Sequence, residues 1–483
     1  MVTESSSNAG PVHGSEQPLP GIAAAIAGAI AAAGGRALVV GGWVRDRLLG
    51  QDSKDVDFEA YGLEPAALRE VLARIGPVNT VGESFTVYKV ADIDVALPRR
   101  ESKTGRGHKA FEVIGDPFMP AAEAARRRDF TVNAIAWDPL TGEYIDPFDG
   151  RADLEARRLR MVDPRTFGDD SLRVLRGLQL AARFDLVMDD ATRQVCRGLN
   201  LDDLPAERVW GEIEKLLLLA PRPSVGWWLA RELNVLPQLF PEMQALIDCP
   251  QEPEWHPEGD VWIHTLMVID EARTRIADLP HAKQVTVMLG AVCHDLGKPA
   301  TTAFSDGRIR SMEHEQAGVA PAAALLDRLN IHSMAGFDVR AQVLGIVAHH
   351  LKPLSFFKAA SPVGDGAFRR LAQKADLELL ARVAESDCLG RGGSFDCSGI
   401  GWFVERARAL GVQHAPPAPL LLGRHLLALG VRPGPRVGVV LRQVYEQQLD
   451  GRVQTVDDGI ALARTLIADG GGDDESRGAA RDE

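Results

Sequence analysis

At 483 residues the chain is too long for one hydrophobic core, and its length suggests about three domains. Hydrophobic residues make up 45% of it and charged residues 25%, as in an ordinary soluble globular protein. The net charge of −13 argues against a protein that coats nucleic acid with its whole surface. A local basic track is still compatible with that charge.

The five cysteines are scattered and form no Cys-x-x-Cys pair. We therefore expect no disulfide framework and a cytoplasmic protein in a reducing environment. Residues 1–20 are rich in Ser, Gly and Pro and show no secretory pattern. The alanine-rich stretch 21–33 is too short to span a bilayer and ends at two glycines, so it predicts a helix and no membrane contact.

The chain changes character near residue 164. Before it, short β-rich runs alternate with helical ones, which predicts an α/β or α+β part with strands at 37–40, 56–59, 86–90 and 93–97. After it, apolar residues recur at helical spacing over 171–184, 206–219 and 223–233. From there to about residue 468 we expect only helices and loops.

The densest group of candidate binding residues starts with two adjacent glycines. A buried strand runs into Gly41 and Gly42, and a helix follows. Backbone N–H groups and a helix N-terminus then meet at one point, which suits a triphosphate, and Arg45 can add guanidinium donors. A glycine pair alone more often marks a tight turn.

Asp55 and Asp57 follow on the next predicted strand. Residues two apart on a strand leave the same face, and two carboxylates this close repel unless a cation lies between them. Mg²⁺ prefers such oxygen ligands together with those of a triphosphate. Asp94 or Asp92 on a neighbouring strand can supply a third carboxylate. An isolated pair of this kind is also common on exposed strands.

Further motifs follow in a fixed order. They are Gly-Gly-x-Val-Arg-Asp-x-Leu-Leu-Gly at 41–50, Lys-Asp-x-Asp at 54–57, Arg-Arg-Asp-Phe-Thr-x-Asn-Ala at 127–134 and Ile-Asp-Pro-Phe-x-Gly at 145–150. With them the chain closely resembles the bacterial tRNA nucleotidyltransferase and poly(A) polymerase family, within the polymerase-β-like nucleotidyltransferases. Residues 167–176 resemble the nucleotide-selecting helix of that family, and residues 204–210 resemble its neck.

The resemblance implies transfer of a nucleotide by in-line attack of a 3′-hydroxyl on an α-phosphate. One Mg²⁺ would sharpen the nucleophile while another neutralises the leaving pyrophosphate. Arg128 would contact the nucleotide or ribose, with Asp129 and Asn133 beside it. The implied catalytic residues are Asp55, Asp57 and Asp94, of which Asp55 and Asp57 bind Mg²⁺, and the implied nucleotide-binding residues are Gly42, Arg45, Arg128, Asp170, Arg173 and Arg176.

Asp170 and Arg173 have a physical reason to read the base. Cytosine and adenine both offer an amino donor beside a ring-nitrogen acceptor, which a carboxylate and an arginine satisfy together. Uracil and guanine present the opposite polarity, which leaves buried groups unpaired. One protein site could thus accept CTP and ATP without a template. The alternative interpretation is an ordinary i,i+3 salt bridge on a helix.

Two positions depart from the family pattern. The usual Glu-Asp pair of the selecting helix is Asp169-Asp170 here. More seriously, Gln179 stands where the family commonly has arginine, so a charge at the nucleotide becomes a neutral amide. Arg183 is a candidate substitute for the lost phosphate contact.

A second group of polar residues lies far downstream, although the whole chain has only 12 histidines. Imidazole and carboxylate ligands suit Mn, Fe, Co, Ni or Zn better than Mg, and such sites activate water for phosphoester hydrolysis. The members are His264, His294, Asp295, His314, His349, His350 and Asp387.

This order of residues resembles the HD phosphohydrolase superfamily over 260–390. Similar tRNA nucleotidyltransferases carry an HD domain at this position, which implies phosphatase, 2′-nucleotidase and 2′,3′-cyclic phosphodiesterase activities. The ligands favoured by the resemblance are His264, His294, Asp295 and Asp387, while His314, His349 and His350 stay secondary candidates. The alternative is a degenerate fold kept as a scaffold that grips RNA.

The whole chain is therefore interpreted as α+β, with a polymerase-β-like head of mixed sheet and helices before all-α neck, HD and tail domains. The predicted segments are a disordered N-terminus (1–20), the head (21–163), the neck (164–248), the HD domain (249–400), a helical C-terminal region (401–468) and a disordered tail (469–483).

The predicted function is addition of CCA to the 3′ end of tRNA. The expected partners are the tRNA acceptor end, CTP and ATP, with no membrane, and the sequence defines no oligomeric state. Addition of poly(A) or of part of the CCA triplet shares the same motifs and stays open. A different class is a metal phosphohydrolase whose head has decayed into an RNA-binding module, against which the intact Asp55 and Asp57 argue.

Overall fold

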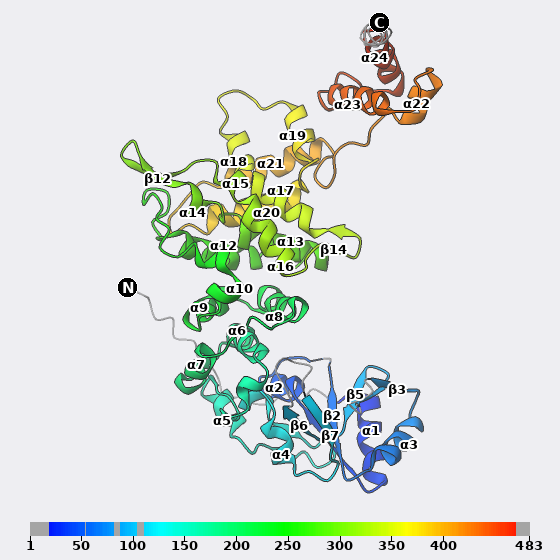
Figure 1. Cartoon of the computed structure of the whole chain (residues 1–483), viewed down its shortest axis with the longest axis vertical. Coiled ribbons are helices and arrows are strands. Elements are labelled where there is room, and N and C mark those ends of the chain that lie inside the picture. Colours follow the sequence, from blue (N-terminus) through cyan, green and yellow to red (C-terminus); the bar gives the residue numbers. More distant parts are fainter. Residues whose placement is uncertain (1–18, 54, 82–86, 104–110, 470–483) are drawn as a thin grey trace, which may run out of the picture. The chain divides into compact units, whose positions relative to one another are not determined.

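The computed structural model describes residues 19–53, 55–81, 87–103 and 111–469. The chain divides into two compact units, Met1–Pro241 and Glu242–Glu483, each described by itself (Figure 1). The two segments predicted to be disordered lie almost entirely outside the described residues, as do the side chains of most of the basic stretch 99–109. Within the described ranges, no helix is both long and apolar enough to cross a membrane.

A seven-stranded mixed sheet forms the centre of the first unit, in the order β3-β4-β5-β2-β1-β8-β9. Only β2 and β5 pair in parallel; the other neighbours in this sheet are antiparallel. The mixed sheet confirms the predicted head architecture. Its strands are β1 (Arg36–Val40), β2 (Asp57–Tyr61), β3 (Val78–Val81), β4 (Val87–Val90), β5 (Ile93–Ala96), β8 (Ala136–Trp137) and β9 (Tyr144–Ile145).

Helices of the first unit cover the sheet and then take over the chain. The alanine-rich helix α1 (Gly21–Ala32) buries Ala23, Ile26 and Ile30 against β1 and packs beside α3 (Pro65–Ala73) (Figure 1). The remaining elements around the sheet are α2 (Gly42–Leu48), the hairpin β6 (Arg99–Lys103) and β7 (Phe111–Gly115), α4 (Ala121–Arg126), the 3₁₀ turn η1 (Thr131–Asn133) and α5 (Gly150–Glu155).

The neck is helical, as its apolar spacing predicts. Helix α6 (Leu172–Phe184) is the most buried of these helices and packs against α8 (Ala206–Leu219) and α9 (Ser224–Glu232). The other neck elements are β10 (Arg158–Leu159), η2 (Phe167–Asp169), β11 (Val187–Met188), α7 (Asp190–Arg197), α10 (Leu236–Leu239) and α11 (Pro241–Gln244).

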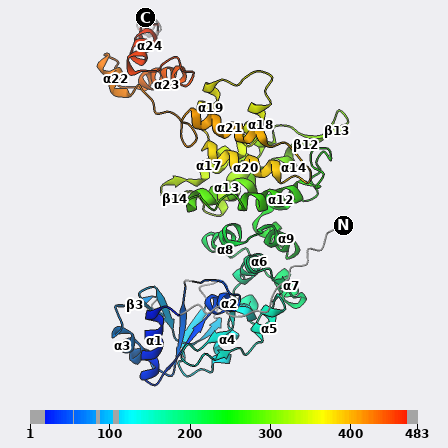
Figure 2. The same cartoon turned by 180° about the vertical axis from the view of Figure 1, so that it is seen from behind.

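The second unit is built around α13 (His281–Cys293), which carries a nearly unbroken buried apolar run. It packs against α12 (Val261–Arg273), α17 (Val339–His349) and α20 (Leu377–Leu389) (Figure 2). The other helices of this unit are α14 (Lys298–Thr301), α15 (His314–Ala317), α16 (Val319–Arg328), α18 (Lys352–Phe357), α19 (Asp365–Leu371), α21 (Ser398–Ala409), α22 (Gly423–Ala428), α23 (Pro435–Leu449) and α24 (Val456–Asp469).

The expectation of only helices and loops after the neck is wrong in detail. Two short antiparallel hairpins interrupt the helices, formed by β12 (Thr302–Ser305) with β13 (Arg308–Ser311) and by β14 (Ser333–Met334) with β15 (Phe337–Asp338). Glycines with positive φ, Gly307 and Gly336, sit in the two turns. Each strand has no more than four residues. Its alternation of apolar and polar residues is therefore too short to be recognised in the sequence.

Candidate functional site

The turn between β1 and α2 has the geometry that the glycine pair predicts. Gly41 adopts φ 77° and ψ −143°, a backbone conformation that residues with a side chain rarely take. Its Cβ position lies 3.5 Å from an Nη1 atom of Arg128, so the chain passes close to the motif at 127–134. Gly42 and Arg45 then begin α2, beside the end of the strand.

Asp57 and Asp94 are direct neighbours across the parallel strands β2 and β5. Partial removal from solvent, together with the negative charge of Asp94, raises the pKa of Asp57 to about 6. A buried oxygen of Asp94, Oδ1, has no hydrogen-bond partner. Acidic oxygens that repel each other and lack donors are the environment a divalent cation relieves.

Only one of the two candidates for the third carboxylate lies beside Asp57. Asp94 lies on β5 next to Asp57, whereas Asp92 lies in the exposed turn before that strand. Asp55 precedes the first residue of β2, and its charge also acts to raise the pKa of Asp57. These carboxylates lie farther apart than the ligand atoms of a histidine-containing group in the second unit, which is described below. The comparison covers the described part of the chain.

A second acid on β2 holds the arginines of the next motif. Glu59 is buried, with its Oε1 atom 2.5 Å from Nη2 of Arg127 and 3.2 Å from Nη2 of Arg128. Burial opposes ionisation, but the two guanidinium groups lower the pKa of Glu59 overall. Arg128 is thus held at the edge of β2 beside the glycine turn. No sequence motif singles out Glu59, although its position two residues after Asp57 places it on the same strand face.

A chain of hydrogen bonds joins three of the motifs. Nε of Arg176 donates to Asp129 at 2.6 Å, and the amide of Asn133 donates to the other oxygen of Asp129 at 3.1 Å. Nη1 of Arg45 donates to the amide oxygen of Asn133 at 2.7 Å. Arg45 is buried, also pairs with Asp46, and lies 4.0 Å from the ring centre of Phe184. These contacts fix the positions of Arg45 in the head and Arg176 on the neck helix α6.

Asp170 and Arg173 are held apart by other partners. An oxygen of Asp170 accepts from Nη2 of Arg208 at 2.9 Å. Arg173 donates to the carbonyl oxygens of Thr166 at 3.0 Å and Arg127 at 2.5 Å. The structure therefore places both residues at the junction of head and neck without an ion pair between them. Arg208 belongs to the neck motif, but nothing in its local sequence predicts this contact.

Gln179 and Arg183 contact each other one helical turn apart. Nη1 of Arg183 donates to the amide oxygen of Gln179 at 3.0 Å, and the guanidinium lies 4.9 Å from the ring centre of Phe184. Burial and then the positive charge of Arg45 lower the pKa of Arg183. The ring of Phe184 thus brings two guanidinium groups together, an arrangement that an anion would stabilise.

We expect Arg183→Ala to raise the apparent KM for nucleotide about tenfold with little change in kcat, because one triphosphate contact is lost in ground and transition states alike. Steady-state kinetics with CTP measure this. Gln179→Arg, which restores the charge at the neighbouring position, should keep activity near wild type. A wild-type KM for Arg183→Ala would contradict a phosphate contact by this residue.

A buried group of six residues lies in the second unit, and we call it the histidine cluster. The side-chain nitrogens and oxygens converge from the ends of separate helices. All six residues are at most 7% exposed. They are His264 on α12, His294 and Asp295 after α13, His314 at the start of α15, His350 after α17, and Asp387 on α20.

All four residues favoured by the sequence meet in one half of this cluster. Nε2 of His264 lies 3.2 Å from Asp387, 3.6 Å from Asp295 and 3.4 Å from Nε2 of His294. Nε2 of His294 lies 3.1 Å from Asp295. Of the secondary candidates, His314 and His350 join the cluster on the other side of Asp295, whereas His349 does not.

Local structure explains how these residues meet. Asp260 caps α12 by accepting from the backbone N–H of Ile263 at 2.9 Å, which sets the start of the helix that carries His264. Gly297 lets α15 approach the end of α13. A Cβ atom at Gly297 would come within 2.0 Å of the carbonyl oxygen of His314. Any side chain there would push His314 away from Asp295.

Polar groups around the cluster keep its acids ionised. Although burial opposes ionisation, the charges of His294 and Lys298 hold the pKa of Asp295 well below its usual range. The ammonium of Lys298 lies 2.7 Å from Asp295 Oδ2 and donates to Gln251 at 2.7 Å. Likewise, the hydrogen bond with His264 and the charge of Arg391 hold the pKa of Asp387 low despite its burial.

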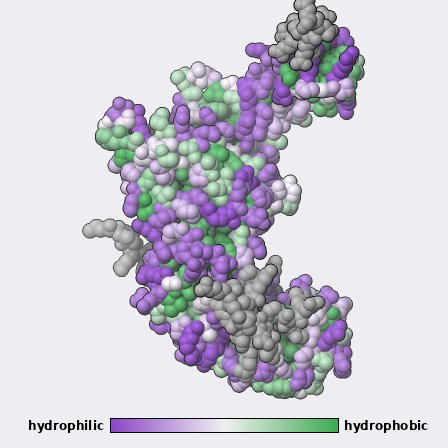
Figure 3. Space-filling model, in the orientation of Figure 1, coloured by the Kyte–Doolittle hydropathy of each residue, from purple (hydrophilic) through white to green (hydrophobic). Residues whose placement is uncertain are grey.

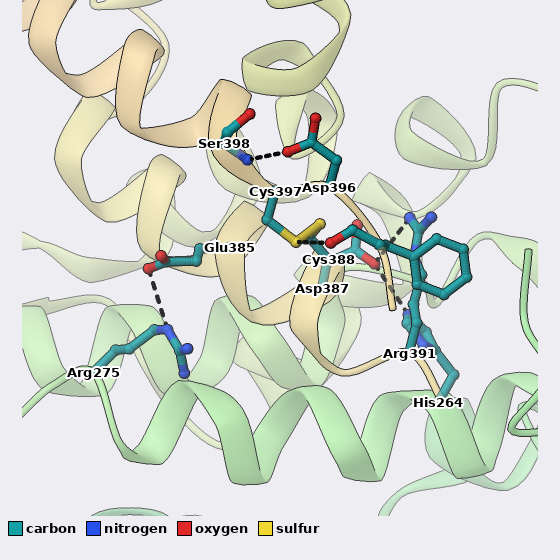
Figure 4. The surroundings of a disulfide bond; sticks show 10 residues. His264, Arg275, Glu385, Asp387, Cys388, Arg391, Asp396, Cys397 and Ser398 are labelled. Carbon is teal, nitrogen blue, oxygen red and sulfur yellow. Dashed lines mark hydrogen bonds and ion pairs between the residues drawn. A yellow bond between two sulfur atoms is a disulfide. The ribbon is translucent and has the colours of Figure 1, made fainter. Parts of the chain in front are cut away.

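A disulfide adjoins the cluster, although the scattered cysteines predict no disulfide framework. Cys388 and Cys397 are bonded, with Cα atoms 6.0 Å apart. Figure 4 shows Asp387, Arg391 and His264 around this bond. The pair links the end of α20 to the loop before α21. Such proximity arises from tertiary structure and leaves no Cys-x-x-Cys signature. Cys196, Cys249 and Cys293 are buried thiols.

The chain is similar to known proteins of one family. Residues 37–160 match the poly(A) polymerase head domain, and residues 188–247 match a probable RNA- and SrmB-binding site of polymerase A. The chain is 39% identical over 302 residues to the multifunctional CCA protein of Xanthomonas oryzae pv. oryzae, covering 61% of this chain and 70% of that protein. It is 38% identical to that of Methylobacillus flagellatus, covering 66% and 74%.

Solved structures share the fold. The Bacillus stearothermophilus CCA-adding enzyme in complex with CTP superposes with a TM-score of 0.61 at 21% identity, covering 92% of this chain and 97% of that one. The Thermotoga maritima CCA-adding enzyme in complex with tRNA gives 0.55 at 18%, covering 94% and 97%.

The fold and the head site together define a nucleotidyltransferase. The chain belongs to the family of multifunctional CCA proteins, which are tRNA nucleotidyltransferases. A nucleotidyltransferase head of this fold depends on a divalent metal, and the carboxylates of β2 and β5 have the donor chemistry for Mg²⁺.

Proposed function

We propose that this protein adds CCA to the 3′ end of tRNA from CTP and ATP. The observation that supports this most is the pairing of Asp57 with Asp94 on neighbouring parallel strands, close to the glycine turn. The raised pKa of Asp57 and the unpartnered oxygen of Asp94 support a cation site at these acids. We propose a cytoplasmic location for this reaction, because its proposed substrates tRNA, CTP and ATP occur there.

Asp55, Asp57 and Asp94 would hold two Mg²⁺ ions, which would activate the 3′-hydroxyl and neutralise the charge of the departing pyrophosphate. The residues of the chain position the nucleotide. Gly41 and Gly42 let the triphosphate approach the backbone, and Arg45, Arg128 and Arg183 supply positive charge around it. Burial of Arg45 and its bonds to Asp46 and Asn133 keep that charge in a fixed place.

We further propose that Asp170 and Arg173 select the base. In the structure, Arg208 donates a hydrogen bond to the carboxylate of Asp170, and Arg173 donates to two backbone carbonyl oxygens. A cytosine or adenine would exchange these contacts for its own amino group and ring nitrogen. Uracil or guanine offers the wrong polarity and would leave both side chains unpaired, which costs about 1–3 kcal/mol per buried group.

The direct test is incubation of the purified protein with tRNA that lacks its 3′ CCA, followed by sequencing of the products. CTP alone should add two residues, and CTP with ATP should add the complete triplet. UTP and GTP should add none. A long run of A from ATP alone would favour poly(A) addition, and arrest after the two C residues would favour partial CCA addition. No addition with any nucleotide would favour a decayed head.

We propose a second activity, metal-dependent hydrolysis of phosphoesters, for the histidine cluster. Its supporting observation is the convergence of His264, His294, Asp295 and Asp387 in a buried site. Imidazole and carboxylate ligands favour a borderline transition metal such as Ni²⁺, Mn²⁺, Co²⁺, Fe²⁺ or Zn²⁺. Such a metal would supply an activated water. A 2′,3′-cyclic phosphate suits the site because water can displace one ring oxygen, which leaves with the proton.

A further inference from the structure

The disulfide between Cys388 and Cys397 closes a loop, residues 390–396, that joins α20 to α21. We call it the disulfide loop. Its residues 390, 392 and 393 are glycines. A segment so rich in glycine loses much conformational entropy when it is ordered, so its conformation depends strongly on how its ends are held. Here one end is Cys388 in the buried part of α20, and the disulfide fixes the other end to it.

The disulfide loop holds two residues of the histidine cluster from outside. An Nη2 atom of Arg391 lies 3.5 Å from Oδ1 of Asp387, which is a member of the cluster (Figure 4). The backbone N–H of Gly392 donates to Oε2 of Glu258 at 3.0 Å. The other oxygen of Glu258 lies 2.9 Å from Nδ1 of His264, a second member of the cluster. The loop therefore supports Asp387 directly and His264 through one intermediate carboxylate.

The loop runs so close to the start of α12 that glycine is required. A Cβ atom at Gly390 would come within 2.9 Å of the backbone nitrogen of Val268, and one at Gly392 within 3.1 Å of that of Glu258. The side chain of Glu258 is only 2% exposed, so it depends on its hydrogen bonds inside the protein. If the loop moved away, Glu258 would lose the N–H of Gly392 and hold His264 less firmly.

The two sulfur atoms of the disulfide differ in exposure. Cys388 is buried, whereas Cys397 is only half-buried, so a small thiol can reach the sulfur of Cys397. Its thiolate attacks that sulfur, the S–S bond breaks, and the sulfur of Cys388 leaves and takes up a proton. A second small thiol then attacks the mixed disulfide at Cys397. This releases a low-molecular-weight disulfide and leaves two protein thiols; the reverse steps, with that disulfide as oxidant, restore the bond.

We propose that Cys388 and Cys397 form a reversible oxidation site that controls hydrolysis at the histidine cluster. This inference rests on the proposed hydrolase function and adds its regulation. Disulfides in cytoplasmic proteins are usually transient and often sense the redox state. With the bond closed, the disulfide loop holds Asp387 and Glu258 in place, and hydrolysis runs. With the bond reduced, the glycine-rich loop is released and hydrolysis falls. The site proposed for CCA addition has none of these contacts and does not respond.

The test compares the full-length protein with the bond closed and open. One sample is treated with oxidised glutathione and the other with dithiothreitol, and both are desalted without air and assayed with the same Mn²⁺ concentration. Alkylation and peptide mass spectrometry measure how much of Cys388 and Cys397 is free thiol. Hydrolysis of a 2′,3′-cyclic nucleotide should be about ten- to a hundredfold slower in the reduced sample, as is typical when partners of metal ligands are lost. CCA addition should be equal in both, and reoxidation should restore hydrolysis.

Hydrogen exchange gives a readout that does not depend on hydrolysis. The amide of Gly392, which is bonded to Glu258 when the loop is closed, should exchange about tenfold faster or more in the reduced protein. Amides of α23, in the same unit, should exchange at the same rate in both samples.

Variants assign the effect to this pair of cysteines. Cys397→Ser should hydrolyse slowly in either buffer, and its CCA addition shows that it is folded. Cys196→Ser is the matched control, because it removes a buried thiol of the first unit, and it should keep the redox response. Failure of the bond to form with oxidised glutathione, or equal hydrolysis and exchange in both samples, would overturn the oxidation site and leave the hydrolase standing. Absence of hydrolysis in both samples would overturn the proposed hydrolase and this regulation with it.

Discussion

Replacing Asp57 with alanine is expected to lower kcat/KM for nucleotide addition about a thousandfold, equivalent to about 4 kcal/mol of transition-state stabilisation. Asp57 lies beside Asp94 in the parallel pair β2–β5, where partial burial and the charge of Asp94 raise the pKa of Asp57 to about 6. Removing the carboxylate removes a metal ligand. Affinity for tRNA should stay nearly unchanged, because the side chain holds metal and not RNA.

Single-turnover addition of CMP to tRNA lacking CCA measures the chemical step, and filter binding measures the tRNA affinity. Asp92→Ala is the matched control. This residue is also an aspartate of the same sheet region, but it lies in the exposed turn before β5 and does not face Asp57. Asp55→Ala should behave as Asp57→Ala does. Addition at the wild-type rate by either of these two variants would contradict their role as metal ligands.

Replacing His294 with alanine is expected to reduce hydrolysis of a 2′,3′-cyclic nucleotide more than about a hundredfold, and to leave CCA addition intact. His294 contributes one of the Nε2 atoms that face Asp295, at 3.1 Å. Removing a residue that only hydrogen-bonds to a metal ligand typically lowers metal affinity or activity about ten- to a hundredfold. Removing a ligand itself should lower activity more than that. Hydrolysis should require added Ni²⁺, Mn²⁺ or Co²⁺, whereas addition should run on Mg²⁺.

Both activities are assayed on the same preparation, so retained CCA addition shows that the variant is folded. His349→Ala is the matched control and should hydrolyse as wild type does. Asp57→Ala should show the reverse pattern, with hydrolysis kept and addition lost. If His294→Ala stopped nucleotide addition in a folded protein, the two sites would be coupled. If no metal supported hydrolysis, the second unit would be better interpreted as a scaffold that grips tRNA.

Charge and hydropathy say little about where these sites lie. Hydrophilic residues predominate on the face drawn in Figure 3, with smaller hydrophobic patches among them. The excess of acidic residues holds for the chain as a whole, while the first unit brings together Arg45 and Arg128 of the head and Arg176 and Arg183 of α6. Net charge therefore gives no measure of the local field at a site.

The sequence by itself determined the head fold, and it supplied most of the residues proposed for its site. Glycine at a positive φ, paired acids on one strand and an ordered set of motifs are local requirements of phosphate and metal chemistry, so they appear as short patterns. The mixed sheet and the helical neck are confirmed for the same reason, since strand and helix periodicities are local. His264, His294, Asp295 and Asp387 were also identified from their order in the chain, and the structure brings them together.

Only the tertiary structure decided which groups complete these sites. Glu59 holding Arg128, Arg208 holding Asp170, and the disulfide between Cys388 and Cys397 are contacts whose partners have no fixed spacing. The same is true of the choice of Asp94 over Asp92, and of His314 and His350 over His349. In each case the candidates are chemically alike and neighbours in the chain. Which one reaches the site depends on strand register and on the angle at which helices end, and these are set by packing across the whole unit.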